Sequence, residues 1–455
     1  MMRSLYSGVA GLKTHQTRMD VIGNNIANVN TTAYKSQSMT FSDLMYQTTQ
    51  AASGANPTTG VGGTNARQIG LGAKTSAIKT AITTQGASQT TNDPFDIMIT
   101  GDSFFIVNNG QNNYFTRDGS FYVDGAGNLA MTSTGYNVMG WQVDPNDASA
   151  IKQDTVSALR VMTTENMTYP PEATKSARIS GIIDKNDTNV NATAGKIMNL
   201  EFYDNQGYKY TAKLSIHSTK TDGQFTVKLD DILDSKGKTV LADPTKASLQ
   251  QNNADVKDPV LEFDLKNGSF KNVGPTGGAA GGTESTLTLH FDAGTFPSFT
   301  DITIDFSNCS NLNNNGSSTV SPIRGDAKGN GAGRKVGEMS GIDIQKDGMI
   351  YANYDNGCSR LLGQIAVATF ANASGLAKEG DNLYSATQNS GDFDGIGTDI
   401  TTGGGYMNTG VLEMSNVDLS SEFTEMITTQ RGFQANSRII TVSDTLLEEL
   451  TNLKR

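Results

Sequence analysis

The sequence predicts a multidomain, mainly β protein whose N- and C-terminal α-helices pair to form a coiled-coil core. Its 455 residues exceed what one hydrophobic core usually organises, so several compact units are expected. Hydrophobic residues make up only 36% of the chain, and 49 glycines together with many Asn, Ser and Thr favour turn-rich β structure. Helical periodicity is confined to the two ends, which places the helices there.

A helix is predicted at the N-terminus, with Ser4 as its N-cap. Alternating steps of four and three residues place one set of side chains along a single stripe of this helix: Leu5, Val9, Leu12, Gln16, Met19, Gly23 and Ile26. The stretch "GNNIANVNTTAYKSQ" at 23–37 is rich in Asn, which forms helices poorly because its side chain hydrogen-bonds the local backbone. The helix is therefore expected to stop within this stretch.

A second helix is predicted near the C-terminus, with Asp418 or Ser420 as its N-cap. Its stripe follows the same spacing: Leu419, Phe423, Met426, Gln430, Phe433, Ser437, Ile440 and Leu447. The first helix is basic and the second is acidic, so the two are expected to pair. Small or polar residues stand at inward positions of both stripes: Gln16, Gly23, Gln430 and Ser437. A lone pair would therefore have a thin core, and packing into an array of many chains would bury more surface.

Between the helices, short apolar and aromatic runs alternate with turns. Asp118-Gly119, residues 124–128 and Asp347-Gly348 are predicted to form hairpin turns. A strand-rich stretch with loop-rich boundaries separates the first two turns from the third, which indicates one β domain split by an insertion. The predicted units are 1–30 with 413–455 as the coiled-coil core, 31–75 as an extended linker, 76–145 with 336–412 as an inner β domain, and 146–335 as an inserted outer β domain of one or two subdomains.

Charge and composition exclude several classes of protein. The net charge of −11 argues against a nucleic-acid partner, because phosphate binding requires a basic face. No run of 18 or more apolar residues occurs, so no direct membrane insertion is expected. The N-terminus lacks the apolar core and the cleavage site of a secretory signal peptide.

Residues that carry chemistry are few and scattered. The three His lie far apart, and Cys309 and Cys358 are expected to be unpaired or buried thiols, with a single bridge as the alternative. The Gly-rich stretch 274–286 lacks the Lys of a phosphate-binding loop. No nucleophile with a base partner stands out. No catalytic residue, metal or cofactor is therefore expected.

Four stretches carry a resemblance to a known family. They are "SLYSGVAGLKTHQTRMDVIGNNIANVNTTAYKSQ", "FTRDGSFYVDGAGNLAMTSTGYNVMGW", "LLGQIAVATFANASGLAKEGDNLYSATQNSG" and "GVLEMSNVDLSSEFTEMITTQRGFQANSRIITVSDTLLEELTNL". In this order they resemble the bacterial flagellar axial family of rod and hook proteins, and within it the hook proteins most. The resemblance covers about 1–145 and 336–455, whereas 146–335 matches only in position and strand-rich character.

The resemblance implies a structural, non-enzymatic role. In this family the terminal helices line a narrow channel as the inner tube of a helical homo-polymer, whose subunits contact each other head to tail. A hook bends while it rotates and passes torque from rod to filament as a universal joint. The implied partners are the distal rod protein, the hook-capping protein, the hook-filament junction protein and the flagellar type III export apparatus. The implied location is the extracellular hook of the bacterial flagellum, reached without a cleaved signal peptide.

The stripes and the resemblance together imply an assembly interface formed by these residues: Leu5, Val9, Leu12, Met19, Ile26, Leu419, Phe423, Met426, Phe433, Ile440 and Leu447. Asn24, Asn25 and Asn28 are expected to end the helix and to bond to adjacent subunits, while Tyr34 anchors the linker. The linker after Tyr46 is long for a hook protein. A longer linker between neighbouring subunits is expected to stiffen the joint.

Two alternatives are kept. The long linker is similar to that of distal rod proteins, although these typically lack a large insert. An extracellular carbohydrate-binding or hydrolytic β protein with accessory helices belongs to a different class, and it would be a stable monomer with affinity for saccharide. A polymer subunit would instead have terminal helices that order only on assembly.

Overall fold

The chain divides into two compact units. The computed structural model describes every residue except 1, 55–59, 61, 146, 242–243, 253, 276–283 and 454–455, so most of the Gly-rich stretch 274–286 lies outside the described residues. The first unit comprises Met1–Asn166, Ile342–Ala352 and Arg360–Arg455, and the second comprises Met167–Gly341 and Asn353–Ser359. The predicted fold class is confirmed, since several β-sheets accompany terminal helices that pack together. The finer division into four parts stays a prediction.

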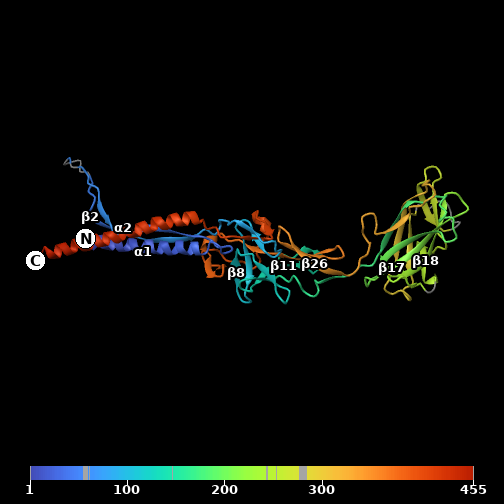
Figure 1. Ribbon diagram of the computed structural model, residues 1–455, viewed down its shortest axis with the longest axis horizontal. Coiled ribbons are helices and arrows are strands. Elements are labelled where there is room, and N and C mark those ends of the chain that lie inside the picture. Colours follow the sequence, from blue (N-terminus) through green and yellow to red (C-terminus); the bar gives the residue numbers. More distant parts are fainter. Residues whose placement is uncertain are drawn as a thin grey trace. The chain divides into compact units, whose positions relative to one another are not determined.

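The two terminal helices pack against each other in the first unit (Figure 1). They are α1 (Met2–Ala27) and α2 (Leu419–Asn452). The Asp418 carboxylate accepts the backbone N–H of Ser420 at 2.9 Å, so Asp418 is the N-cap of α2. Just after α1, the Asn24 carbonyl accepts both the side-chain amide of Asn28 at 2.9 Å and its backbone N–H at 3.2 Å, so Asn28 closes the last turn of the helix. Neither helix is long and apolar enough over its described residues to cross a membrane.

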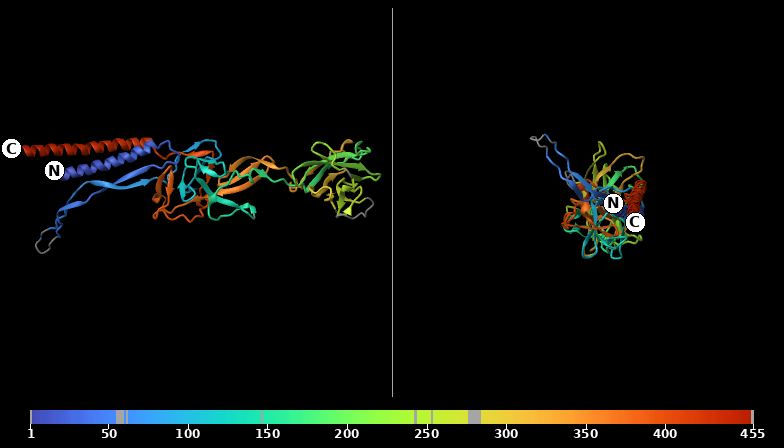
Figure 2. Two further views of the ribbon diagram at one scale, coloured as in Figure 1. Left: turned by 90° about the horizontal axis from the view of Figure 1, so that it is seen from below. Right: turned by 90° about the vertical axis from the view of Figure 1, so that its left-hand side faces the viewer.

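A long antiparallel hairpin, here called the arm, follows α1 (Figure 2). Its base pairs β1 (Gln37–Asp43) with β4 (Ala73–Thr80), and its outer part pairs β2 (Tyr46–Gln50) with β3 (Arg67–Gly70). Every residue of β2 and β3 is exposed. The segment predicted as an extended linker therefore folds as a two-stranded ribbon.

The rest of the first unit is a β region whose strands come from both sides of the insert. The strands are β5 (Ser88–Thr90), β6 (Ile97–Ile99), β7 (Phe104–Asn108), β8 (Asn113–Thr116), β9 (Phe121–Val123), β10 (Leu129–Met131), β11 (Asn137–Asp144), β12 (Asp147–Ile151), β13 (Ser157–Ala158), β28 (Ser359–Ile365), β29 (Val367–Ala368), β30 (Ala377–Gly380), β31 (Leu383–Ser385), β32 (Met407–Thr409) and β33 (Val411–Glu413), with short 3-10 helices at Ala373–Gly375 and Ile400–Gly403. Neighbouring strands run in the order β28-β11-β7-β8-β31-β30. The core includes Phe104, Phe115, Trp141 and Tyr384.

Two of the three predicted hairpin turns are confirmed and one is wrong. Residues 124–128 connect the paired strands β9 and β10, and Asp347-Gly348 connects β26 (Gly337–Ile344) to its neighbour β27 (Met349–Tyr354). β8 and β9, on either side of Asp118-Gly119, do not pair with each other. At this point the chain crosses to β6, where the Ile97 N–H donates to the Gly119 carbonyl at 2.9 Å. A side chain at Gly119 would collide with the Ile97 carbonyl, so the glycine permits this close approach.

The second unit contains two sheets around one hydrophobic core. Its further strands are β14 (Thr168–Tyr169), β15 (Ser176–Ile182), β16 (Lys196–Tyr203), β17 (Lys209–Ser218), β18 (Gln224–Asp234), β19 (Ala247–Gln251), β20 (Ala254–Asp255), β21 (Val260–Phe263), β22 (Phe270–Gly274), β23 (Thr286–Phe291), β24 (Ile302–Ser310) and β25 (Ser321–Arg324), with a 3-10 turn at Pro244–Lys246. The sheet orders are β20-β19-β23-β24-β15-β25 and β16-β17-β18-β21-β22. Side chains alternate between buried and half-buried along β23, as expected for a strand with one face on the core. Both sheets contribute to the same buried cluster.

The two cysteines do not pair. Cys309 and Cys358 are both free and buried. Burial raises the pKa of the Cys309 thiol to about 12, and its Sγ donates to the Ile179 carbonyl at 3.3 Å. The alternative of a single bridge is therefore wrong for this fold.

Candidate functional site in the terminal helices and their junction

Small and polar side chains form the seam between α1 and α2. The helices run antiparallel, since Ser4 Oγ lies 3.4 Å from Ser443 Oγ at one end and Asn25 Nδ2 donates to Glu422 Oε1 at 2.8 Å near the other. The seam positions of α1 alternate by four and three residues: Ser4, Gly8, Gly11, His15 and Arg18, with Asn25 seven further on. This spacing is that of a coiled-coil seam.

Glycines let the two backbones approach closely at this seam. A Cβ atom at Gly11 would lie 2.8 Å from the Asn436 amide, and one at Gly432 would lie 2.6 Å from the His15 ring. A Cβ at Gly8 would be 3.2 Å from Ile440. The contact is therefore tight but buries little apolar surface, because few of the side chains in it are apolar.

Many apolar side chains of the pair are exposed to solvent. The exposed set includes Tyr6, Val9, Phe423, Ile427, Phe433, Ile439, Val442, Leu446 and Leu450, which range from 38% to 66% exposed. Single exposed apolar residues are ordinary on protein surfaces, but this many on one helix pair mark a surface that other molecules cover. These side chains, here called the open apolar face, lie on more than one side of α2, since about 3.6 residues per turn place Phe423 and Leu446 on different sides of the helix.

The predicted interface residues lie beside the seam or on the open face. Leu5, Leu12, Met19, Ile26, Met426, Ile440 and Leu447 are half-buried, whereas Val9, Leu419, Phe423 and Phe433 are exposed. The positions expected to face inward are instead exposed: Gln16, Gly23, Gln430 and Ser437. On α1 the seam runs one residue before the predicted stripe, so that assignment of the inward face was wrong. The use of the stripes in assembly stays a prediction.

Asn25 acts within its own chain. It is fully buried, its Nδ2 donates to the Gln37 carbonyl at 2.7 Å, and its Oδ1 accepts the Gln37 N–H at 2.9 Å and the Tyr34 hydroxyl at 3.3 Å. Asn24 Nδ2 donates to the Tyr34 hydroxyl at 3.1 Å. The buried Tyr34 is thus fixed to the end of α1. Because the Asn25 amide is consumed by these bonds, the expectation that it bonds to an adjacent subunit is not supported by this structure.

Where the chain leaves α1 and enters α2, the side chains of Lys35, Arg117 and Glu413 form a buried cluster of charges. No sequence motif indicates this cluster. Lys35 Nζ lies 2.7 Å from Glu413 Oε1 and donates to the Thr84 carbonyl at 2.8 Å. Arg117 Nη1 lies 3.9 Å from Glu413 Oε2, and this guanidinium also donates to the Gly101 carbonyl. The charged side chains of Lys35, Arg117 and Glu413 are each only 1% exposed. Glu413 is therefore the nearest counter-ion of both buried cations, and the charge of Asp102 also acts on both.

Burial controls the protonation of the groups around this cluster. Desolvation lowers the pKa of Lys35, and the Glu413 charge opposes that shift. The pKa of Arg117 is lowered for the same reason and opposed by the same carboxylate. Burial likewise raises the pKa of the nearby Tyr384 hydroxyl and of the Asp118 carboxyl. Removing one partner of such a cluster leaves an uncompensated buried charge, which costs about 3–5 kcal/mol.

The cluster joins three segments that are distant in sequence. Lys35 lies between α1 and β1, Arg117 follows β8, and Glu413 ends β33 just before α2. Each residue belongs to one of the stretches that carry the family resemblance. Membership of these stretches is therefore the signal that could have identified the three residues as important. Residue type alone would place Lys, Arg and Glu on the protein surface.

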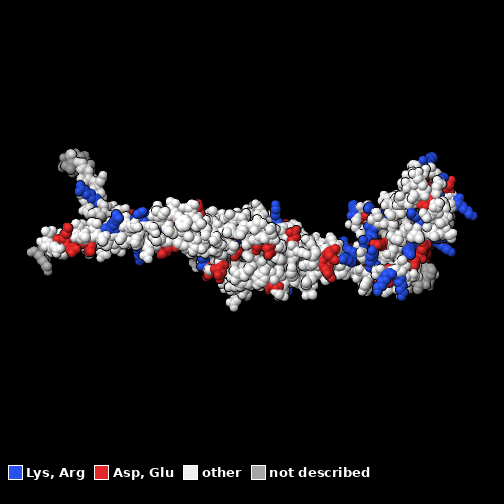
Figure 3. All heavy atoms as spheres, viewed as in Figure 1, with Lys and Arg blue, Asp and Glu red and all other residues white. Residues whose placement is uncertain are grey.

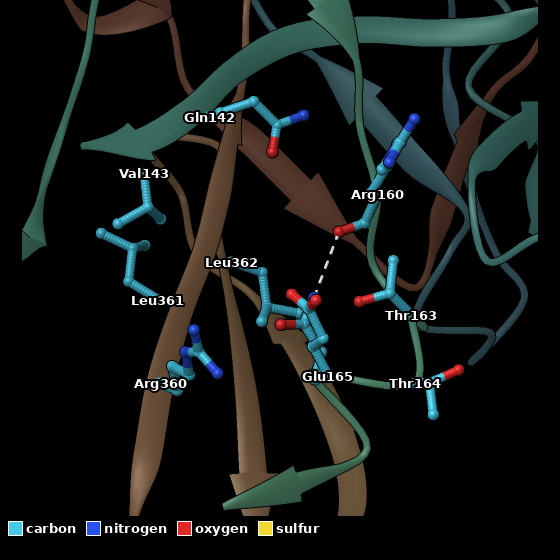
Figure 4. A pocket seen from close by; sticks show the side chains of 10 residues that line it. Gln142, Val143, Arg160, Thr163, Thr164, Glu165, Arg360, Leu361 and Leu362 are labelled. Carbon is cyan, nitrogen blue, oxygen red and sulfur yellow. Dashed lines mark hydrogen bonds between the residues drawn. The ribbon is translucent and has the colours of Figure 1, made fainter. Parts of the chain in front are cut away.

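A cavity of about 380 Å³ in the first unit does not suit glycoside chemistry (Figure 4). Its walls include Gln142, Arg160, Glu165, Arg360 and Leu362. Glu165 is the one carboxylate among its described lining residues, whereas glycoside hydrolysis uses two. Asn166 Nδ2 donates to the Arg160 carbonyl at 3.4 Å, which ties the cavity wall together.

A Ser-His-Asp group in the second unit has the wrong order for nucleophilic catalysis. Ser215 Oγ donates to Asp230 Oδ1 at 2.9 Å and lies 3.0 Å from His217 Nε2. In a catalytic triad the His stands between the other two and removes the Ser proton. Here the Ser stands in the middle and donates its hydrogen bond to the carboxylate, so the group serves to hold β17 and β18 together.

Comparison with known proteins agrees with this arrangement. Three family models match: "Flagella basal body rod protein" over residues 5–35, "Flagellar hook protein FlgE/F/G D1 domain" over 98–180 and "Flagellar basal body rod FlgEFG protein C-terminal" over 408–453. The first and last of these cover most of the helix pair and the junction residues Lys35 and Glu413.

Similar proteins match along their whole length. The flagellar hook protein FlgE of Borreliella burgdorferi is 36% identical over 470 residues, and that of Treponema pallidum is 34% identical over 481 residues, each covering all of both chains. The flagellar basal-body rod protein FlgG of Bacillus subtilis is 30% identical over 455 residues, also covering both chains fully. The chain therefore belongs to the flagellar hook protein (FlgE) family of the rod and hook proteins, as a non-enzymatic structural subunit of a polymeric assembly in the flagellum.

Proposed function

We propose that copies of this chain polymerise through their terminal helices into a curved, flexible tube that transmits torque from rod to filament as a universal joint. The observation that carries this proposal is the open apolar face of the helix pair, whose seam is made of small and polar side chains. Covering such a face with the helices of neighbouring copies would stabilise the assembly by roughly 1 kcal/mol for each half-exposed apolar side chain. Several side chains per copy, repeated over many copies, give a stable tube.

The proposal also includes the partners and the location of the chain, which family membership supports. A hook subunit would meet the distal rod protein at one end of the tube, and the hook-capping and hook-filament junction proteins at the other. The flagellar type III export apparatus would deliver the chain to the extracellular hook without cleaving a signal peptide. The seam supports this route, because a helix pair with little apolar core unfolds easily for passage and orders again on assembly.

Electron microscopy of the assembled full-length chain tests the proposal. The wild-type chain is expected to form tubes, whereas Leu12→Asp and Phe433→Asp are expected to remain monomeric, because each variant places a charge in the covered face. Ile197→Asp is the matched control, since Ile197 is an exposed apolar residue of the second unit. A wild-type chain that stays a monomer with ordered terminal helices would overturn the proposal, as would normal tubes from either helix variant.

A further inference from the structure

Five asparagines of the chain stand directly before a glycine, and the structure holds one of these pairs differently from the rest. A glycine has no Cβ, so its backbone nitrogen can approach the side chain of the preceding asparagine closely. Each pair is therefore a place where the chain can modify itself with water as the only reagent. All five lie within the described residues: Asn109-Gly110, Asn267-Gly268, Asn315-Gly316, Asn330-Gly331 and Asn356-Gly357.

The reaction at such a pair replaces the side-chain amide by a carboxylate. The glycine nitrogen loses its proton to solvent and bonds to the side-chain carbonyl carbon of the asparagine, while the amide nitrogen takes up a proton and leaves as ammonia. Water then opens the cyclic imide at either carbonyl carbon, which gives aspartate or isoaspartate. The step needs an amide that can turn toward the glycine and a glycine N–H that is free, so a hydrogen bond to either group opposes it.

In four of the pairs the glycine N–H is already bonded. Exposure does not protect them, since Asn109, Asn267 and Asn315 are exposed. Hydrogen bonding therefore holds these pairs. The donors and acceptors are Gly110 with Asn108 Oδ1, Gly268 with the Asp264 carbonyl at 2.7 Å, Gly316 with Asp184 Oδ2 at 2.8 Å and Gly357 with the Tyr354 carbonyl at 3.1 Å. Three of the asparagine side chains are also fixed, because each accepts a backbone N–H: Asn109, Asn267 and Asn356.

The pair Asn330-Gly331 lacks this restraint. Among the described residues, the Gly331 N–H has no hydrogen-bond acceptor. Asn330 is exposed to water, and within the same part of the chain its amide makes one bond, from Nδ2 to Asp326 Oδ2 at 3.2 Å. We propose that Asn330 is the site at which the folded chain deamidates, and that the other four pairs are protected. The inference does not depend on the proposed polymer.

The modification would act on the contact between this loop and β15. The Asn330 carbonyl accepts the Ser176 hydroxyl at 2.6 Å, and the Gly331 carbonyl accepts the Lys175 N–H at 2.8 Å. Isoaspartate routes the backbone through the former side chain, which lengthens it by one methylene group and shifts both carbonyls. Aspartate instead places a second carboxylate beside Asp326. Acidic and basic side chains are interspersed over the second unit (Figure 3), so the effect of the new charge stays local.

Peptide mapping by mass spectrometry tests the inference on the full-length chain kept in mildly alkaline buffer. Each conversion adds one dalton to the peptide concerned. In the folded chain Asn330 is expected to convert about tenfold faster than the other four asparagines, the factor that one hydrogen bond of ordinary strength contributes. In urea all five are expected to convert at similar rates. Faster conversion at another pair in the folded chain, or an equal preference for Asn330 in the unfolded chain, would overturn the inference.

Two matched variants identify the restraint. Asp326→Ala removes the bond to the Asn330 amide and is expected to accelerate conversion at Asn330. Asp264→Ala is the control, because each carboxylate accepts the N–H two residues further on, yet the Gly268 N–H keeps its bond to the backbone carbonyl of residue 264. Conversion at Asn267 is therefore expected to stay unchanged. Acceleration at Asn267, or none at Asn330, would contradict the role given to these hydrogen bonds.

Proteolysis measures the structural consequence. Trypsin is expected to cut after Lys328 faster in an aged chain than in a fresh one, because either product loosens the loop from β15. Asn330→Gln should remain resistant on ageing, since the longer side chain would have to form a larger ring. Equal cleavage of aged and fresh chains, or equal sensitisation of Asn330→Gln, would show that modification of Asn330 does not loosen this loop.

Discussion

At the scale of single residues, the cluster of Lys35, Arg117 and Glu413 shows how one carboxylate can stabilise a junction. Glu413 meets the Lys35 ammonium at 2.7 Å and also accepts the backbone N–H of Gly86 at 2.9 Å. Its carboxylate thus fixes the strand that leads into α2 to the segment that leaves α1. Because the three side chains are buried, the cluster stabilises the fold only while Lys35, Arg117 and Glu413 are all present.

Glu413→Gln is therefore expected to destabilise the chain by about 3–5 kcal/mol, since Lys35 and Arg117 would keep their charges without their nearest counter-ion. Denaturant unfolding of the full chain measures this loss. Glu425→Gln is the control, because Glu425 pairs with Arg18 at 3.0 Å on the surface and such pairs contribute less than about 1 kcal/mol. Equal losses in the two variants would contradict the buried cluster.

His15 gives the helix pair a dependence on pH. Its ring lies in the seam opposite Gly432, and burial lowers its pKa, with a smaller effect from the Arg18 charge. The unfolded chain then binds a proton more readily than the folded one, so stability is full above about pH 6.5 and falls as the pH drops below it. The helix content of the assembled chain is expected to fall between pH 7 and 5. His15→Gln should reduce this fall, and an unchanged fall would show that other groups cause it.

For single residues, the sequence predicts where α1 ends but not the role of every residue at that end. The Asn-rich stretch does end α1, and the Tyr34 hydroxyl accepts a hydrogen bond from Asn24 at that helix end. Asn25 was expected to reach a neighbour, yet its amide is used inside the chain. No local pattern distinguishes these two uses, because both require a polar side chain at a helix end and only the fold shows which partners are close.

At the scale of elements, the helices illustrate what periodicity can and cannot predict. The alternating steps of four and three residues correctly predicted both helices. They do not identify the face of each helix that meets the partner helix, because the stripe of regularly spaced apolar residues is not that face. The seam is made of Gly8, Gly11, Gly432 and polar neighbours, and the apolar stripe lies beside it. A hydrophobic pattern shows which face is buried in the final assembly, and it does not show which molecule buries it.

Two glycines separate the seam from the open face experimentally. Gly23 has no atom within 4 Å of an added Cβ, so Gly23→Ala is expected to stabilise α1 by up to about 1 kcal/mol through helix propensity. Gly432→Ala has the same propensity gain, but its Cβ would lie 2.6 Å from the His15 ring and should push the helices apart. Thermal unfolding followed by helix content compares the two. A rise in melting temperature for both variants would argue against the close seam.

The paired strands of the arm are not predicted from the sequence, which indicates an extended linker there. A glycine- and threonine-rich stretch is typical of a linker, and the ribbon forms only because the two ends of this stretch pair with each other, as Tyr46 does with Gly70. Deleting residues 50–65 is expected to make assembled tubes more flexible or more curved, because a longer linker is predicted to stiffen the joint between copies. Electron microscopy of tube curvature measures the effect. Tubes with unchanged curvature and flexibility would contradict a stiffening role.

At the scale of the whole molecule, composition was the better guide. Few apolar residues and many glycines predicted a mainly β chain, and the structure has that character from β1 to β33. The pairing of strands from before and after the insert could not be predicted in detail, because it depends on contacts between residues more than 200 positions apart. Gly140 on β11, for example, pairs with Ile365 on β28. Such long-range pairing leaves no signature in a local stretch of sequence.

The junction below the helix pair also has a mechanical consequence. Two separate backbones leave the helices, one through Lys35 and one through Glu413. The ion pair between these residues clamps them together, next to the hydrogen bonds from Ala33 N–H to the Glu413 carbonyl at 2.7 Å and from Ser36 N–H to the Asn416 side chain at 2.7 Å. A single connecting strand could swivel about its own bonds when twisted. Two clamped strands resist that rotation, so a torsional load applied to the helices reaches the β region without slip. The tube can then bend between copies while each copy remains torsionally stiff within itself.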